Sequence, residues 1–150
     1  MTTIVSRSLS APRALAVLVA VITAFGALLA DFVIPGGAVQ HLRNDDWPPH
    51  AKFHDAQYIV MSILLGALAL ILLIGRGNIT RSRIWTSCAL LATPWLGLLA
   101  AFLFPGTAIE DPGFDNPTIL GLHPQVLLAA ILLILLLTAG LLTTRSQPRG

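Results

Sequence analysis

Residues 45–58 gather most of the side chains in this sequence that could do chemistry: two histidines, three aspartates, a lysine and three aromatics. His50 and His54 are four residues apart, so on a helix they share one face. Gln57 and Tyr58 continue that face at the helical repeat. Imidazole exchanges protons near neutrality because its unperturbed pKa is about 6.5. The stretch therefore predicts a site for proton transfer or for hydrogen bonding to a ligand.

The composition of the chain indicates which elements hold these side chains. Of its 150 residues, 55% are hydrophobic and 11% are charged, whereas soluble domains have about 25% charged residues. Too few polar residues exist to cover a soluble fold, so we expect a single integral membrane domain. The basic residues are scattered singly rather than clustered, which argues against nucleic acid as a partner.

Four apolar segments are long enough to cross a bilayer core of about 30 Å. We expect helices at 14–34, 49–74, 84–104 and 124–142, joined by short connections into an all-α, up-down four-helix bundle. The first should be retained rather than removed as a signal peptide. Its run of seventeen uncharged residues is longer than the apolar region of about 7–15 residues in signal peptides.

The placement of lysine and arginine predicts the orientation in the membrane. One side has two basic residues, Arg43 in the first connection and Lys52 in the first turn of the second helix. Seven lie in the N-terminal segment, the middle connection and the tail. This positive-inside bias predicts that both termini are cytosolic. All acidic residues and histidines fall on the opposite, extracytoplasmic side of the cell membrane, where we expect any acid–base chemistry. The seven arginines are Arg7, Arg13, Arg76, Arg81, Arg83, Arg145 and Arg149.

The polar stripe that contains His50 and His54 is expected to face the bundle interior or water, because polar side chains seldom face lipid. The alternative is an interfacial turn whose histidines lie among lipid headgroups. Two histidines at this spacing can share a zinc ion. Without the glutamate of the metalloprotease motif the spacing is a weak signal, so no metal is assigned, and the sequence names no cofactor.

Polar residues elsewhere are expected to form the other walls of the site. Asp31 lies in the last turn of the first helix, where the helix dipole disfavours an anion. We therefore expect a basic partner for it, such as a histidine, Arg43 or Lys52; the alternative is a hydrated carboxylate at the interface. Glu110 lies in the second outer connection and could form an acid–base pair with a histidine. His123 lies at the start of the last helix.

Residues 47–54, Trp-Pro-Pro-His-Ala-Lys-Phe-His, resemble the WPPHA(R/K)FH signature of a family of small four-helix membrane proteins of bacteria and fungi. That resemblance implies the four-helix architecture and no particular activity. A looser similarity, in helix number and in acids or histidines near one mouth of the bundle, is to the emopamil-binding-protein (EXPERA) superfamily of sterol isomerases and sterol-binding membrane proteins. It implies His54 and Glu110 as proton donor and acceptor.

We therefore predict an enzyme that does isomerase- or cyclase-like acid–base chemistry on a small hydrophobic or isoprenoid-like molecule at the outer mouth. The alternative is a non-catalytic protein that binds a membrane lipid or hydrophobic ligand, or a small subunit of a membrane complex or homo-oligomer. The predicted catalytic residues are His50, His54, Glu110 and Asp31. The predicted substrate-binding residues are Gln57, Tyr58, Trp47, His123 and Asp55.

Overall fold

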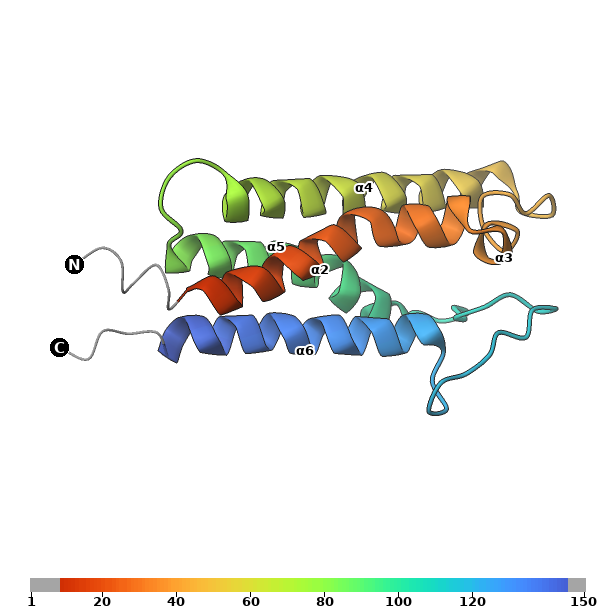
Figure 1. Cartoon of the computed structure of the whole chain (residues 1–150). Coiled ribbons are helices and arrows are strands. Elements are labelled where there is room, and N and C mark those ends of the chain that lie inside the picture. Colours follow the sequence, from red (N-terminus) through yellow and green to blue (C-terminus); the bar gives the residue numbers. More distant parts are fainter. Residues whose placement is uncertain (1–8, 146–150) are drawn as a thin grey trace.

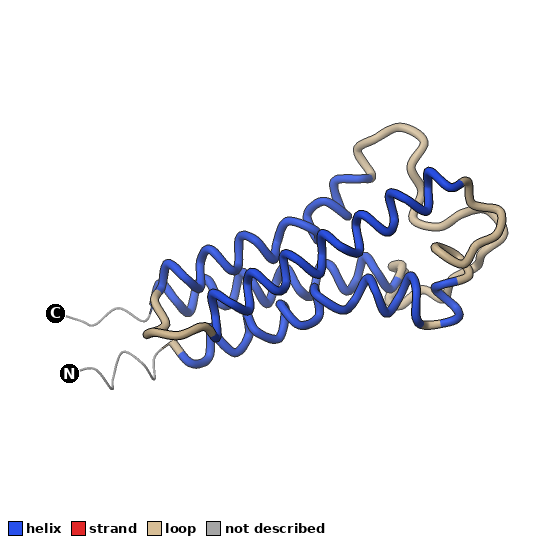
Figure 2. Tube along the Cα trace, turned by 90° about the horizontal axis from the view of Figure 1, so that it is seen from above, coloured by secondary structure: helices blue, strands red, loops and turns tan. Residues whose placement is uncertain are grey.

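The computed structural model describes residues 9–145, which form helices and connecting loops (Figure 1; Figure 2). Four helices are long and apolar enough to cross a membrane. The chain is therefore a four-helix bundle with the features of a multi-pass membrane protein. Its elements are α2 (Ser10–Leu28), the π-helical turn η1 (Leu29–Val33), the single turn α3 (Pro35–Ala38), α4 (Pro49–Ile74), α5 (Arg81–Ala101) and α6 (Pro124–Arg145).

The four long helices lie side by side, and their connections divide between the two ends of the bundle (Figure 1). The short α4–α5 connection lies at the end where α2 begins and α6 ends. The α2–α4 and α5–α6 connections are longer and lie at the opposite end, which we call the loop end. The arginines at the first end are Arg13, Arg76, Arg81, Arg83 and Arg145; Arg7 and Arg149 lie outside the described residues.

Helix α5 is shifted from its predicted range of 84–104 by three residues at each end. It begins at Arg81 because the Thr80 side chain caps it, accepting a hydrogen bond from the backbone N–H of Arg83 at 3.3 Å. It ends at Ala101, whose carbonyl oxygen accepts a hydrogen bond from the Thr107 hydroxyl at 2.9 Å. Both ends are therefore set by threonine side chains that lie outside the apolar run.

The other helices lie close to their predicted ranges. Helix α4 spans 49–74, and α6 continues to residue 145 rather than 142. Helix α2 begins at residue 10 rather than 14, and at Leu29 its α-helical pattern gives way to the π turn. That turn is the part of the first span that the sequence did not predict, and it shapes the site described below.

Small residues let α2 and α4 pack closely. Ala20 and Ala24 of α2 are buried against Gly66 of α4. A Cβ atom on Gly66 would lie 2.6 Å from the Ala24 Cβ and 2.8 Å from the Ala20 carbonyl oxygen. Close approach of small residues is a common way for helices to associate in lipid, where no hydrophobic effect drives them together. Gly66 therefore marks the face of α4 that looks into the bundle.

We expect Gly66→Ala to lower the melting temperature of the purified protein, because overpacking a core contact costs about 1–3 kcal/mol. Gly26→Ala is the matched control. Its new Cβ would meet nothing closer than the Ile22 side chain, at 3.9 Å, and alanine is favoured over glycine inside a helix by about 1 kcal/mol. Thermal melts in one detergent compare the two variants. A wild-type melting temperature for Gly66→Ala would contradict this packing.

Candidate functional site

The end of the first span widens into the π turn η1 and brings Asp31 into the protein. In this turn the backbone N–H of Ile34 donates to the carbonyl oxygen of Leu29, five residues earlier, at 2.8 Å. Such turns are rare and frequently lie at functional sites. Asp31 is only 4% exposed. A buried carboxylate requires a partner, because burying an unpaired charge is very unfavourable.

The partner of Asp31 is His41, which follows α3. Its Nδ1 atom lies 3.5 Å from Asp31 Oδ1 and 2.9 Å from the carbonyl oxygen of Gly37. A carbonyl oxygen only accepts hydrogen bonds, so Nδ1 carries a proton and Nε2 of the neutral ring is unprotonated. The basic partner that the sequence led us to expect is thus a histidine. Arg43 lies instead over the Phe32 ring, 5.2 Å from its centroid.

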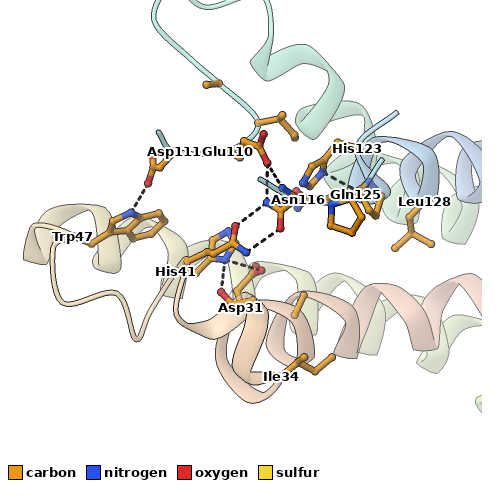
Figure 3. A pocket seen from close by; sticks show the side chains of 17 residues that line it. Asp31, Ile34, His41, Trp47, Glu110, Asp111, Asn116, His123, Gln125 and Leu128 are labelled. Carbon is orange, nitrogen blue, oxygen red and sulfur yellow. Dashed lines mark hydrogen bonds and ion pairs between the residues drawn. The ribbon is translucent and has the colours of Figure 1, made fainter. Parts of the chain in front are cut away.

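A cavity of about 660 Å³ opens at the loop end, with Asp31 and His41 on one wall (Figure 3). The facing wall contains Glu110 and Asn116 from the α5–α6 loop and His123 from the start of α6. Two connections that are far apart in sequence therefore enclose one space. The other polar or aromatic lining residues are Gln40, Trp47, Asp111 and Gln125.

Hydrogen bonds hold the two walls of the cavity together (Figure 3). The side-chain amides of Gln40 and Asn116 pair reciprocally, at 3.0 and 2.8 Å. Glu110 Oε2 accepts from the backbone N–H and from the side-chain amide of Asn116, at 3.2 and 2.8 Å. Trp47 Nε1 donates to Asp111 Oδ2 at 2.7 Å. This network fixes the loop without using His41 or His123, so both imidazoles are left for a ligand.

His123 has the tautomer opposite to that of His41. It precedes Pro124, the first residue of α6, and its Nδ1 atom accepts a hydrogen bond from the backbone N–H of Gln125 at 3.3 Å. A backbone N–H only donates, so this Nδ1 is unprotonated and Nε2 of the neutral ring carries the proton. The cavity is therefore lined by one imidazole that can accept a proton at Nε2 and one that can donate it.

His50 and His54 lie outside the cavity. Both side chains are exposed, as are those of Phe53 and Gln57, and none of these four residues lines the cavity. The prediction that the histidines face the bundle interior is wrong, because the packing of α4 against its neighbours turns another face inward. The buried residues of α4 are Ile59, Ser62, Gly66, Ala69 and Leu73.

Asp55 and Tyr58 are the predicted site residues of α4 that are partly buried. Asp55 interacts electrostatically with both Asp31 and His41. Its Oδ2 atom is shielded from solvent and has no hydrogen-bond partner among the described residues. Buried polar atoms are seldom left unpaired. Asp55 does not line the cavity, and its influence on the Asp31–His41 pair is electrostatic.

Residues 15–150 match a family described as Family of unknown function (DUF6640). The chain belongs to the DUF6640 family. The match covers α4, α5, α6 and most of α2, together with both connections at the loop end, so every lining residue of the cavity lies in the part of the chain that defines the family. No curated protein and no solved structure matches the chain.

A second pocket of this DUF6640 member, about 430 Å³ in volume, lies between α4, α5 and the start of α6. Its lining is mainly apolar and includes Leu65, Pro94 and Leu98, with Tyr58 at its polar edge. Gln125 lines both this pocket and the larger cavity. The cavity at the loop end and an apolar groove between α4 and α5 therefore meet at Gln125.

Proposed function

We propose that the protein is a membrane enzyme that moves a proton on a small amphipathic, isoprenoid-like molecule whose polar end enters the cavity at the loop end. One observation carries this proposal: His41 Nδ1 is hydrogen-bonded to a carbonyl oxygen and His123 Nδ1 to a backbone N–H, and both rings line one cavity. In neutral rings, Nε2 is then an acceptor in His41 and a donor in His123. An isomerisation by proton transfer can use a base that moves the proton and a hydrogen-bond donor that polarises the substrate.

Asp31 would support His41 as the base. When Nε2 takes a proton from the substrate, the ring becomes positively charged. The carboxylate 3.5 Å from Nδ1 then stabilises this imidazolium and holds the ring in its orientation, as the aspartate does in hydrolase triads. His123 would donate a hydrogen bond from Nε2–H to the substrate and polarise it. The proton held on His41 Nε2 would then return to another atom of the same molecule, so that the substrate is isomerised and both rings recover their starting protonation states.

The apolar pocket supports an amphipathic rather than a wholly polar substrate. A molecule whose head lies beside His123 could pass Gln125 and place its chain against Leu65 and Leu98. Sites between the helices of a bundle are common for small ligands. The looser similarity to the EXPERA superfamily suggests the same reaction class, with His41 and His123 in the roles that the similarity gave to His54 and Glu110.

We further infer that the spans alternate in direction and that the loop end faces the extracytoplasmic side. The described arginines at the opposite end support this orientation through the positive-inside rule. The cavity would then receive its substrate from the outer leaflet.

A non-catalytic lipid-binding protein is the second candidate. The observation that favours it is the engagement of Glu110, whose Oε2 already accepts two hydrogen bonds from Asn116. This carboxylate therefore positions the loop instead of standing free as an acid. A binding protein needs such fixed hydrogen-bonding groups but no proton exchange with its ligand.

Deuterium incorporation separates the two candidates. The protein would be purified gently and incubated in D₂O with a total membrane lipid extract, and mass spectrometry would identify the bound molecules and their deuterium content. An enzyme places non-exchangeable deuterium into the lipid that it binds. A binding protein retains a lipid that gains no deuterium. Finding neither a bound lipid nor deuterium incorporation would overturn both proposals.

A further inference from the structure

The exposed face of the first two turns of α4 holds two imidazoles in a chelating arrangement. His50 Nε2 and His54 Nε2 lie 3.1 Å apart, and the ring centroids are 4.4 Å apart. Two nitrogen ligands at about 2.0–2.1 Å from one metal ion are separated by about 2.9–3.4 Å for ligand angles between square-planar and tetrahedral values. The two Nε2 atoms therefore already stand at the separation that a shared metal ion requires.

Gln57 sets the protonation of His54 for this role. The Nδ1 atom of His54 lies 3.3 Å from Gln57 Oε1, and because this oxygen only accepts, Nδ1 carries the proton. The lone pair of Nε2 is then available to a metal. A second hydrogen bond from the far ring nitrogen to a carbonyl-type oxygen is the usual way in which metal-binding histidines are oriented.

His50 must change its tautomer for metal binding. Since His54 Nε2 is unprotonated, His50 Nε2 donates the hydrogen bond between the two rings in the metal-free protein. When a metal ion binds, this proton moves to His50 Nδ1 by exchange with water. Both rings stay neutral, and a small rotation of each ring then turns both Nε2 lone pairs toward the ion.

The pair is exposed and lies beside an aromatic ring. The Phe53 ring lies beside the two histidines, with its centroid 6.4 Å from that of His50 and 5.5 Å from that of His54. Both histidines are exposed. In the part of the chain that the structure describes, no group of three or more histidine, cysteine, aspartate or glutamate side chains is placed to hold a metal. Water would therefore fill the remaining coordination positions.

We propose that His50 and His54 form a surface site for a first-row divalent metal ion that favours imidazole, such as Cu²⁺, Ni²⁺ or Zn²⁺. Affinity should follow the general order for nitrogen ligands, with Cu²⁺ bound most tightly. Mg²⁺ and Ca²⁺, which favour oxygen ligands, should not bind there. The site shares no residue with the acid–base cavity, so it can exist whether or not the proposed reaction does.

Calorimetric titration of Cu²⁺, Ni²⁺ and Zn²⁺ into the full chain, purified in detergent without a polyhistidine tag, tests this site. We expect one ion per chain, and affinity at least ten-fold weaker in His50→Ala and in His54→Ala. Gln57→Ala should weaken binding by a smaller factor. His41→Gln, which alters a histidine of the cavity and retains a donor for the Gly37 carbonyl oxygen, should bind as the wild type does. Unchanged affinity in the double variant His50→Ala/His54→Ala would overturn the proposal.

Electron paramagnetic resonance of bound Cu²⁺ reports how many imidazole nitrogens coordinate the ion. A change in folding does not imitate the loss of a single nitrogen ligand. The wild-type spectrum should show coupling to two imidazole nitrogens, and each single variant should show coupling to one. Because the two side chains are exposed, the variants should melt at the wild-type temperature. A wild-type spectrum without coupling to two nitrogens, or equal binding of Mg²⁺, would also remove the site.

Discussion

Turnover is expected to fall by about 10²- to 10⁴-fold in His41→Ala, the range that one general base contributes. His41 is the only histidine placed beside the buried Asp31 in the part of the chain that the structure describes. Its ring also packs edge-on against Trp47, with centroids 5.5 Å apart. The position of the base is thus fixed on three sides, by Asp31, Gly37 and Trp47. The measurement is the rate of deuterium incorporation into the bound lipid.

His54→Ala is the matched control, because it removes an exposed histidine that does not line the cavity. It should keep the wild-type rate. His41→Ala leaves Asp31 without its partner, so a loss of folding could imitate a loss of chemistry. His41→Gln retains a donor for the Gly37 carbonyl oxygen and should fold, yet it cannot take a proton. Turnover near the wild-type rate in His41→Gln would exclude His41 as the base.

The sequence was insufficient to predict which face of α4 packs into the bundle. From Ile59 onward the helix is apolar on every side, so hydrophobic residues do not mark its inner face. We instead chose the face of His50 and His54, but their turn lies at the edge of the span, where water and headgroups also solvate imidazole. Packing depends on small residues in membrane helices. Gly66, which contacts α2, was the better signal.

The positions of the other polar residues could be inferred, because four spans in one bundle leave few ways to place their ends. Asp31, Glu110 and His123 flank spans whose lengths bring their ends to one side of a bundle, and the structure brings all three to one cavity. Gln40 and Asn116 were missed. Each is a single amide in a polar loop, with no spacing or charge pattern to mark it, and the pairing joins residues 76 positions apart. Only the folded structure reveals such a contact.

The same polar stretch therefore contributes to two different surfaces. Asp55 is partly buried and interacts electrostatically with His41, whereas His50 and His54 are exposed and contact each other. Residues one position apart on a helix differ by about 100° in direction, which is enough to separate them. Variants of Asp55 should thus affect the acid–base cavity, and those of His54 the surface pair.

Gly37→Ala is expected to reduce turnover by about 10²-fold or more, because a displacement of about 1 Å in a catalytic group can have that effect. Gly37 packs against the turn that carries Asp31: a Cβ atom there would overlap the carbonyl oxygen of Ala30. Its own carbonyl oxygen accepts the hydrogen bond from His41 Nδ1. The substitution must therefore push α3 away from η1 and displace His41 from Asp31.

Gly36→Ala is the control for this change, since a Cβ atom on Gly36 would have no neighbour within 4 Å. It should leave turnover and melting temperature unchanged. For Gly37→Ala we also expect a lower melting temperature, since overpacking costs about 1–3 kcal/mol. A lower melting temperature with unchanged turnover would mean that the contact between η1 and α3 stabilises the fold but does not position the base. A lower turnover together with a lower melting temperature in Gly37→Ala, with neither change in Gly36→Ala, links the π turn to the chemistry.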